Sequence, residues 1–143
     1  MSQIVLTSLY NRLVSQTGAG TVHALVGGRI YQIEAPQGVT LPCLVFSISG
    51  NDTEIYMGTA VKSRQQLTAT FVFFFKPDSA AAVATAMAAE AALFTLLNRV
   101  SMTPSDASYT SIESYVLTRG VPDIGEDFIS VETTYRIIAI KDT

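Results

Sequence analysis

The sequence of 143 residues has few charged side chains and few of the residues that build metal or nucleophile sites. Charged residues make up only 15% of it, whereas an average soluble protein has about 25%. The single histidine, His23, excludes a site with two histidine ligands and leaves a catalytic triad no choice of base. The single cysteine, Cys43, has no partner for an intramolecular disulfide, which is consistent with a reducing compartment.

Basic residues are also scarce, and they do not cluster. The sequence has nine Lys and Arg residues and twelve Asp and Glu residues, for a net charge of −3. Without a basic stripe to neutralise phosphates, we do not expect direct binding of nucleic acid. The start of the chain has no positive region before its apolar residues, so we expect a protein made and kept in the cytoplasm. A long alanine-rich segment contains Thr85, Glu90 and Thr95, which argues against a membrane span.

Apolar residues, by contrast, are plentiful at 48% of the sequence. A chain of this length is typical of one compact domain, so we expect residues 1–143 to form a single unit with one core. A surface with little charge is what a subunit shows when part of it is buried in an oligomer. The same composition also fits a monomer with a large core.

Two segments have the spacing of helices. Apolar residues recur every three or four positions over residues 4–14, which predicts an amphipathic helix. A second, longer helix is predicted from residue 78 to about residue 99, with alanines that would let another backbone approach closely. We expect its buried stripe to contain Val83, Met87, Leu93, Phe94, Leu96 and Leu97.

Five segments have the composition of strands: residues 29–33, 41–49, 65–75, 112–118 and 128–140. We expect a turn at Gly27 and Gly28 and loops at 49–58, 101–111 and 119–127. The order of elements predicts an α+β fold, with a mainly antiparallel β-sheet packed by one long and one shorter α-helix.

The two clearest strands differ in how apolar and polar residues are distributed over their two faces. In residues 65–75 one face is apolar from Leu67 to Phe75. Val72 and Phe74 make the end of the other face apolar too, which predicts burial on both sides by this domain or a neighbour. In residues 128–140 one face is apolar and the other polar, until Ile138 and Ile140. We expect a bulge, a bend or a partner to cover that end.

The residues that might carry chemistry favour structural roles. Cys43 lies in an apolar strand, where a thiol stays protonated. The acidic cluster Asp123, Glu126 and Asp127 lacks the alternating ligands of a calcium loop. Gly27 and Gly28 precede a strand and are not followed by lysine and serine, so they are no phosphate-binding loop.

One charged pair suggests contacts beyond its own strand. Glu132 and Arg136 share a strand face but stand about 13 Å apart, too far for a direct ion pair. They would pair across strands or across subunits. Because no pair of titratable groups can be assigned to a pocket, we predict no catalytic, cofactor-binding or metal site and no enzyme activity.

The order of these segments resembles a known family. A helix, then LVGGRIYQIEAPQGVTLPCLVFSISG, a strand rich in Phe, a helix from KPDSAAAVATAMAAEAALFTLLN and a final DFISVETTYRIIAI are similar to the tail completion, or tail terminator, proteins of long-tailed bacteriophages. The similarity runs from about Leu6 to Ile140, and its most specific part is GGRIY followed by APQ and LPCLVF.

The resemblance implies a structural protein of the virion. Copies of such proteins, typically six, form a ring at the head-proximal end of the tail tube, stop tube polymerisation and offer the surface to which the filled head docks. The implied partners are further copies of the chain, the tail tube protein and the head-neck connector. Six copies at −3 each would carry −18, so DNA would pass through the lumen without binding.

For the contacts between copies we expect the alanine-rich helix, the apolar end of the last strand and the loop 49–58. Another neck or head-tail joining subunit is the alternative within the same setting. A small hydrolase or binding enzyme that uses Cys43 or the acidic loop is a more distant one.

Overall fold

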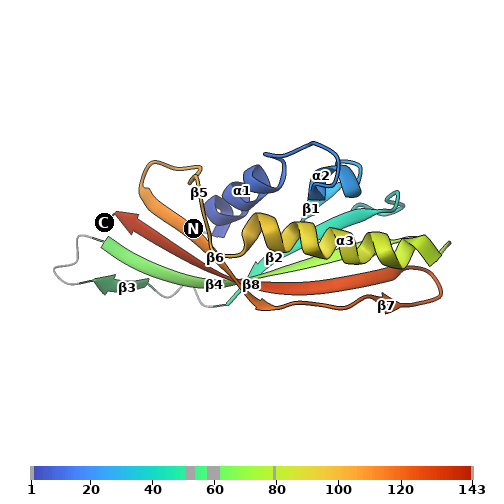
Figure 1. The fold of residues 1–143 in the computed structure, drawn as a ribbon. Coiled ribbons are helices and arrows are strands. Elements are labelled where there is room, and N and C mark those ends of the chain that lie inside the picture. Colours follow the sequence, from blue (N-terminus) through green and yellow to red (C-terminus); the bar gives the residue numbers. More distant parts are fainter. Residues whose placement is uncertain (1, 51–53, 58–61, 79, 143) are drawn as a thin grey trace.

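The computed structural model describes residues 2–50, 54–57, 62–78 and 80–142. The helices there are α1 (Ser2–Leu13), α2 (Val22–Leu25) and α3 (Ala80–Leu97). The strands are β1 (Ile30–Gln32), β2 (Cys43–Ser49), β3 (Glu54–Met57), β4 (Lys62–Phe75), β5 (Val100–Met102), β6 (Tyr109–Thr118), β7 (Asp123–Ile124) and β8 (Ile129–Asp142). All three helices lie on one side of the sheet (Figure 1).

The strands form one sheet in the order β1-β2-β4-β8-β6-β5. Strand β3 adds to β4, and β7 adds to β8. Only the β1–β2 pair is parallel among the described pairs. Strands β4 and β8 pair along their full 14-residue length, from Lys62–Asp142 to Phe75–Ile129. The predicted α+β fold with a mainly antiparallel sheet is therefore confirmed.

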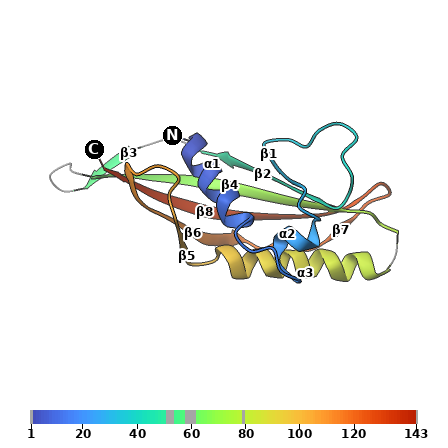
Figure 2. The same cartoon turned by 90° about the horizontal axis from the view of Figure 1, so that it is seen from above.

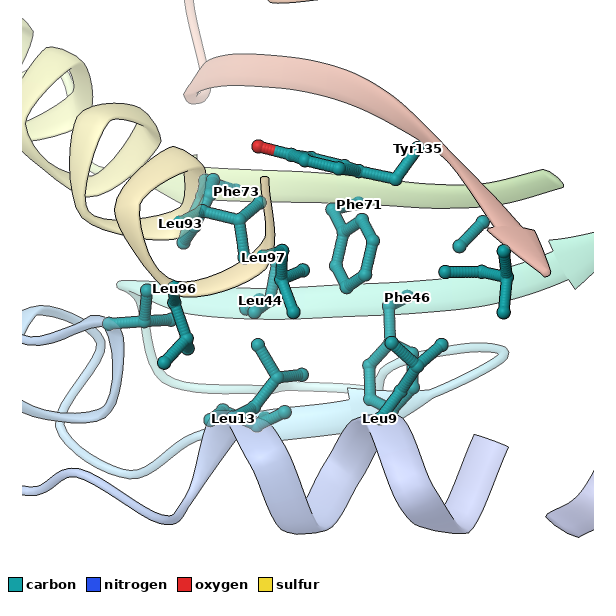
Figure 3. Close-up of a cluster of buried hydrophobic side chains, with 14 of the residues drawn as sticks. Leu9, Leu13, Leu44, Phe46, Phe71, Phe73, Leu93, Leu96, Leu97 and Tyr135 are labelled. Carbon is teal, nitrogen blue, oxygen red and sulfur yellow. The ribbon is translucent and has the colours of Figure 1, made fainter. Parts of the chain in front are cut away.

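The core lies between the sheet and the helix layer. As predicted, one face of β4 is buried along its length, with Leu67, Ala69, Phe71, Phe73 and Phe75. Next to it, β8 buries Ile129, Val131, Tyr135 and Ile137. Leu9 and Leu13 of α1 close this layer from the other side (Figure 3).

The inner aromatic side chains are packed in a chain across three strands. Phe71 stacks on Phe46 with ring centres 5.7 Å apart, and its edge contact with Tyr135 has centres 5.6 Å apart. Aromatic pairs at such distances add to the stability that area burial supplies.

The buried face of α3 differs from the expected stripe. Met87 is 57% exposed, whereas Ala86 and Ala89 are fully buried beside Leu93 and Leu97. The small alanine side chains let the helix lie close to the sheet, so the seam contains alanine where the pattern favoured methionine. The helix also ends at Leu97, two residues before the expected end.

Three expected loops contain short strands. The loop 49–58 holds β3, the linker 101–111 holds the last two residues of β5 and the start of β6, and the segment 119–127 holds β7. Residues 51–53 and 58 lie outside the described residues. Each of these short elements pairs with a longer strand, so the neighbour decides its conformation more than its own sequence does.

The face of the sheet away from the helices carries the apolar residues at the ends of β4 and β8 for which the sequence indicated no packing partner. Val72, Phe74, Ile138 and Ile140 are half-buried there. Phe128 covers Phe74 in an edge contact with ring centres 5.1 Å apart. For the Ile138–Ile140 end of β8 the sequence predicts a bulge, a bend or a partner. The register shift at this end lies in β6, between Tyr109 and Ser111, and a second shift lies between Val116 and Thr118. Cover by a partner stays a prediction.

Seen from above, α1 crosses the strands whereas α3 runs along them (Figure 2). Strands β1 and β7 lie on opposite sides of the sheet in this view, with β2, β4 and β8 between them. No helix in the described part of the chain has the length and apolar character that crossing a membrane requires.

Phe71 lies at the centre of the aromatic core, and its truncation tests that packing. We expect Phe71→Ala to lower the free energy of unfolding by about 3 to 5 kcal/mol, because the substitution leaves a cavity that the long strands cannot close. Phe74→Ala, on the half-covered opposite face of the same strand, is the control and should cost clearly less. Urea unfolding followed by circular dichroism measures both, and equal losses would contradict the assignment of the core.

Candidate functional site

The residues that the sequence offered as candidates for chemistry lie in different parts of the fold. Cys43 is 1% exposed, and burial raises the pKa of its thiol, an effect that the Arg29 guanidinium offsets in part. His23 lies within α2, half-buried, next to Gly28. Cys43 and His23 therefore belong to separate elements of the fold, with Cys43 at the start of β2.

The acidic cluster and the paired glycines also have structural settings. Asp123 lies in β7, and Glu126 and Asp127 follow in the exposed turn before β8. Among the described residues, no three acidic, histidine or cysteine side chains gather closely enough to hold a metal ion. Gly27 and Gly28 both have positive φ, at 62° and 77°, and form the expected turn into β1.

Glu132 and Arg136 are exposed on the face of β8 that the helices leave bare. Within the part of the chain that the structure describes, no ion pair joins them to each other or to another residue. Their expected pairing across strands is therefore absent there, and pairing across subunits stays a prediction.

An ion pair that the sequence did not reveal joins α3 to the chain after β6. The Nε and Nη2 atoms of Arg119 donate to the two carboxylate oxygens of Glu90, each at 2.7 Å. The Glu90 side chain is 9% exposed and that of Arg119 46%. Such a two-pronged contact fixes the orientation of both groups. The only sequence signal for it was an acidic residue on an otherwise alanine-rich helix.

Two aromatic residues surround this ion pair. The guanidinium carbon of Arg119 lies 3.9 Å from the centre of the Phe94 ring, which adds a cation–π contact. The hydroxyl of Tyr135 points toward α3 (Figure 3) and has no hydrogen-bond partner among the described protein atoms. Burial, and then the nearby Glu90 carboxylate, raise the pKa of Tyr135.

The residues after Arg119 form one wall of a hollow against α3. Gly120 lies so close to β8 that a Cβ atom there would overlap the carbonyl oxygen of Glu132. This approach presents Val121, which is 81% exposed, opposite Met87. The hollow has a volume of about 340 Å³, and Met87, Glu90, Ala91, Arg119, Gly120, Val121 and Pro122 line it.

The opposite edge of the sheet carries an unusual isoleucine. Ile33, directly after β1, is 67% exposed and has a φ of 72°. A β-branched side chain rarely adopts this left-handed conformation, because its Cβ crowds the backbone. The Ile33 N–H donates to the Phe46 carbonyl at 2.7 Å, which holds the residue in place.

These features describe surfaces suited to protein contacts. The ion pair anchors the segment 119–122 to α3, and that segment supplies an exposed apolar edge. Among the residues whose burial the structure describes, the other exposed large apolar side chains are Tyr115, Leu117, Ile124 and Phe128. Exposed apolar groups at both edges of one sheet are typical of subunit contacts.

Comparisons with known proteins support the fold. A chain in a structure described as the virion of a native gene transfer agent particle has a TM-score of 0.67 and 18% identity, with 96% of each chain covered. A second solved structure has a TM-score of 0.62 and 10% identity over 100% of this chain and 97% of that one. No family model and no curated protein sequence matches.

The close approach of Gly120 to β8 can be tested by adding one methyl group. We expect Gly120→Ala to lower the melting temperature, because the new Cβ forces the segment 119–122 away from the Glu132 carbonyl. Gly18→Ala is the control, since nothing lies within 4 Å of the added atom. Differential scanning calorimetry compares the two, and an equal effect would contradict the close approach.

Because the hydroxyl of Tyr135 is buried, we predict that the protein loses stability at alkaline pH. Because its pKa is higher in the folded than in the unfolded chain, the stabilisation is complete below about pH 10 and is lost as pH rises further. We expect Tyr135→Phe to reduce this loss and to leave the protein as stable or up to about 1 kcal/mol more stable at pH 7. Urea titrations at pH 7 and above pH 10 check it, and the same alkaline loss in both proteins would contradict it.

Proposed function

We propose that the protein is a structural component of a virion. The observation that carries this proposal is the likeness in fold, across 96% of both chains, to a chain in the virion of a native gene transfer agent particle. The sequence resemblance to tail terminator proteins supports the same setting independently. We also propose that the protein has no enzyme activity.

Within the virion, we assign the protein to a ring at the head-proximal end of the tail tube. The ring would consist of six copies, end tube polymerisation and present the docking surface for the head connector. Exposed apolar residues on both edges of the sheet favour side-by-side assembly of copies. The net charge of −3 per copy keeps such a ring acidic, as suits a passage for DNA.

Assembly tests the ring. We expect native mass spectrometry and negative-stain microscopy of the purified protein to show a closed oligomer, either alone or after purified tail tubes are added. A protein that stays monomeric at high concentration and forms no ring on the tubes would refute the proposal.

A null mutant of the phage separates the terminator from the alternative joining role. Loss of a terminator removes the stop to polymerisation, so we expect overlong tails in electron micrographs. Tails of normal length beside unattached filled heads would instead assign the protein to another neck or head-tail joining position.

A further inference from the structure

The two apolar features at the sheet edges differ in shape. Ile33 projects from the edge at β1, whereas Met87 and Val121 border a hollow at the edge formed by α3 and the segment 119–122. One copy of the chain therefore carries both a projecting side chain and a hollow lined by apolar groups.

The strand register places the two features in one row across the sheet. The pairs along this row are Gln32–Phe46, Phe46–Phe71 and Phe71–Thr133. Ile33 continues β1 at one end of the row, and Gly120 contacts Glu132, the neighbour of Thr133, at the other end. Four strand spacings of about 4.8 Å separate the ends, or roughly 19 Å. Figure 2 shows the β1 and β7 edges on opposite sides of the sheet.

The polar groups at the two features are complementary as well. Glu34, next to Ile33, is exposed. In the hollow, Arg119 uses Nε and Nη2 for Glu90, which leaves Nη1 on its half-exposed guanidinium for another carboxylate. Glu90 already compensates the charge of Arg119, and Asp123 lies beyond Val121 on the same edge. The Nη1 N–H groups of Arg119 are therefore the donors that an acidic partner meets at this hollow.

The backbone at Ile33 adds a second, independent observation. Nearly all β-branched residues avoid a φ near 72°, and strained positions, which persist only where the surrounding structure holds them, cluster at functional sites. Here the strain directs an apolar side chain into solvent, where it gains nothing within its own fold.

We infer that Ile33 of one copy inserts into the hollow between α3 and the segment 119–122 of the next copy, with Glu34 facing Arg119. This inference rests on the proposed ring and specifies its subunit contact. Because two different patches meet, the contact is head-to-tail and repeats from copy to copy, so it closes into a ring when the rotation between copies allows.

Two substitutions test the contact from its two sides. Ile33→Asn removes the projecting group and Val121→Asp places a charge at the hollow. We expect each variant alone to be monomeric under conditions in which the unchanged protein forms rings, with tail tubes present if they are required. An equimolar mixture should form heterodimers and nothing larger. Ile33 of the Val121→Asp variant can still enter the intact hollow of the Ile33→Asn variant, and no second contact is left to add a further copy.

Stability distinguishes a role of Ile33 in the subunit contact from a role in its own fold. Asn tolerates positive φ far better than Ile, so we expect Ile33→Asn to raise the melting temperature of the monomer by roughly 2 to 6 °C while it abolishes assembly. Ala107→Asp, which places the same charge at an exposed loop position outside both features, is the control and should still assemble.

The outcomes separate the contact from the ring. Rings that persist in Ile33→Asn or Val121→Asp, or a mixture that yields no heterodimers, would overturn the contact and leave the proposed function standing. If the unchanged protein never assembles, alone or on tail tubes, both the contact and the proposed function fall.

Discussion

The pairing of β4 with β8 is the constraint on which the rest of the structure depends. The two 14-residue strands pair along their whole length, and they carry four of the six buried aromatic side chains among the described residues: Phe71, Phe73, Phe75 and Tyr135. Every other strand adds to this pair directly or through β2 or β6. Because residues directly opposite share a face, a slip of one residue would expose the whole core at once, so the pattern of the two strands specifies their register strongly.

The helix layer then follows from the apolar face of this pair. Helix α3 packs on β8, β4 and β6 through Ala86 and Ala89, whose small side chains bring the helix backbone close to the sheet. Close packing leaves Glu90 nearly buried, and a buried carboxylate is stable only with a partner. Arg119 supplies that partner with two hydrogen bonds and thereby positions the segment after β6.

Placing that segment has a consequence at the surface. The helices cover one face of the sheet only (Figure 1), and the edges carry apolar side chains that the fold does not bury. Ile33 is held in a strained conformation by its hydrogen bond to Phe46 at one edge, and the Arg119 segment presents Val121 at the other. A domain with unused apolar groups at both edges is suited to association with its own kind, in keeping with the role we propose.

The sequence by itself determined the elements whose patterns are long and regular. The alternation in β4 and β8, the spacing in α1 and the glycine turn before β1 predicted the α+β fold and most of the core, because periodicity reports which side of an element is buried. Tertiary structure alone decided the short strands β3, β5 and β7, the alanine seam of α3 and the Glu90–Arg119 pair. Each of these depends on a neighbour distant in the sequence, and Glu90 and Arg119 are brought together only when α3 and β6 pack on β8.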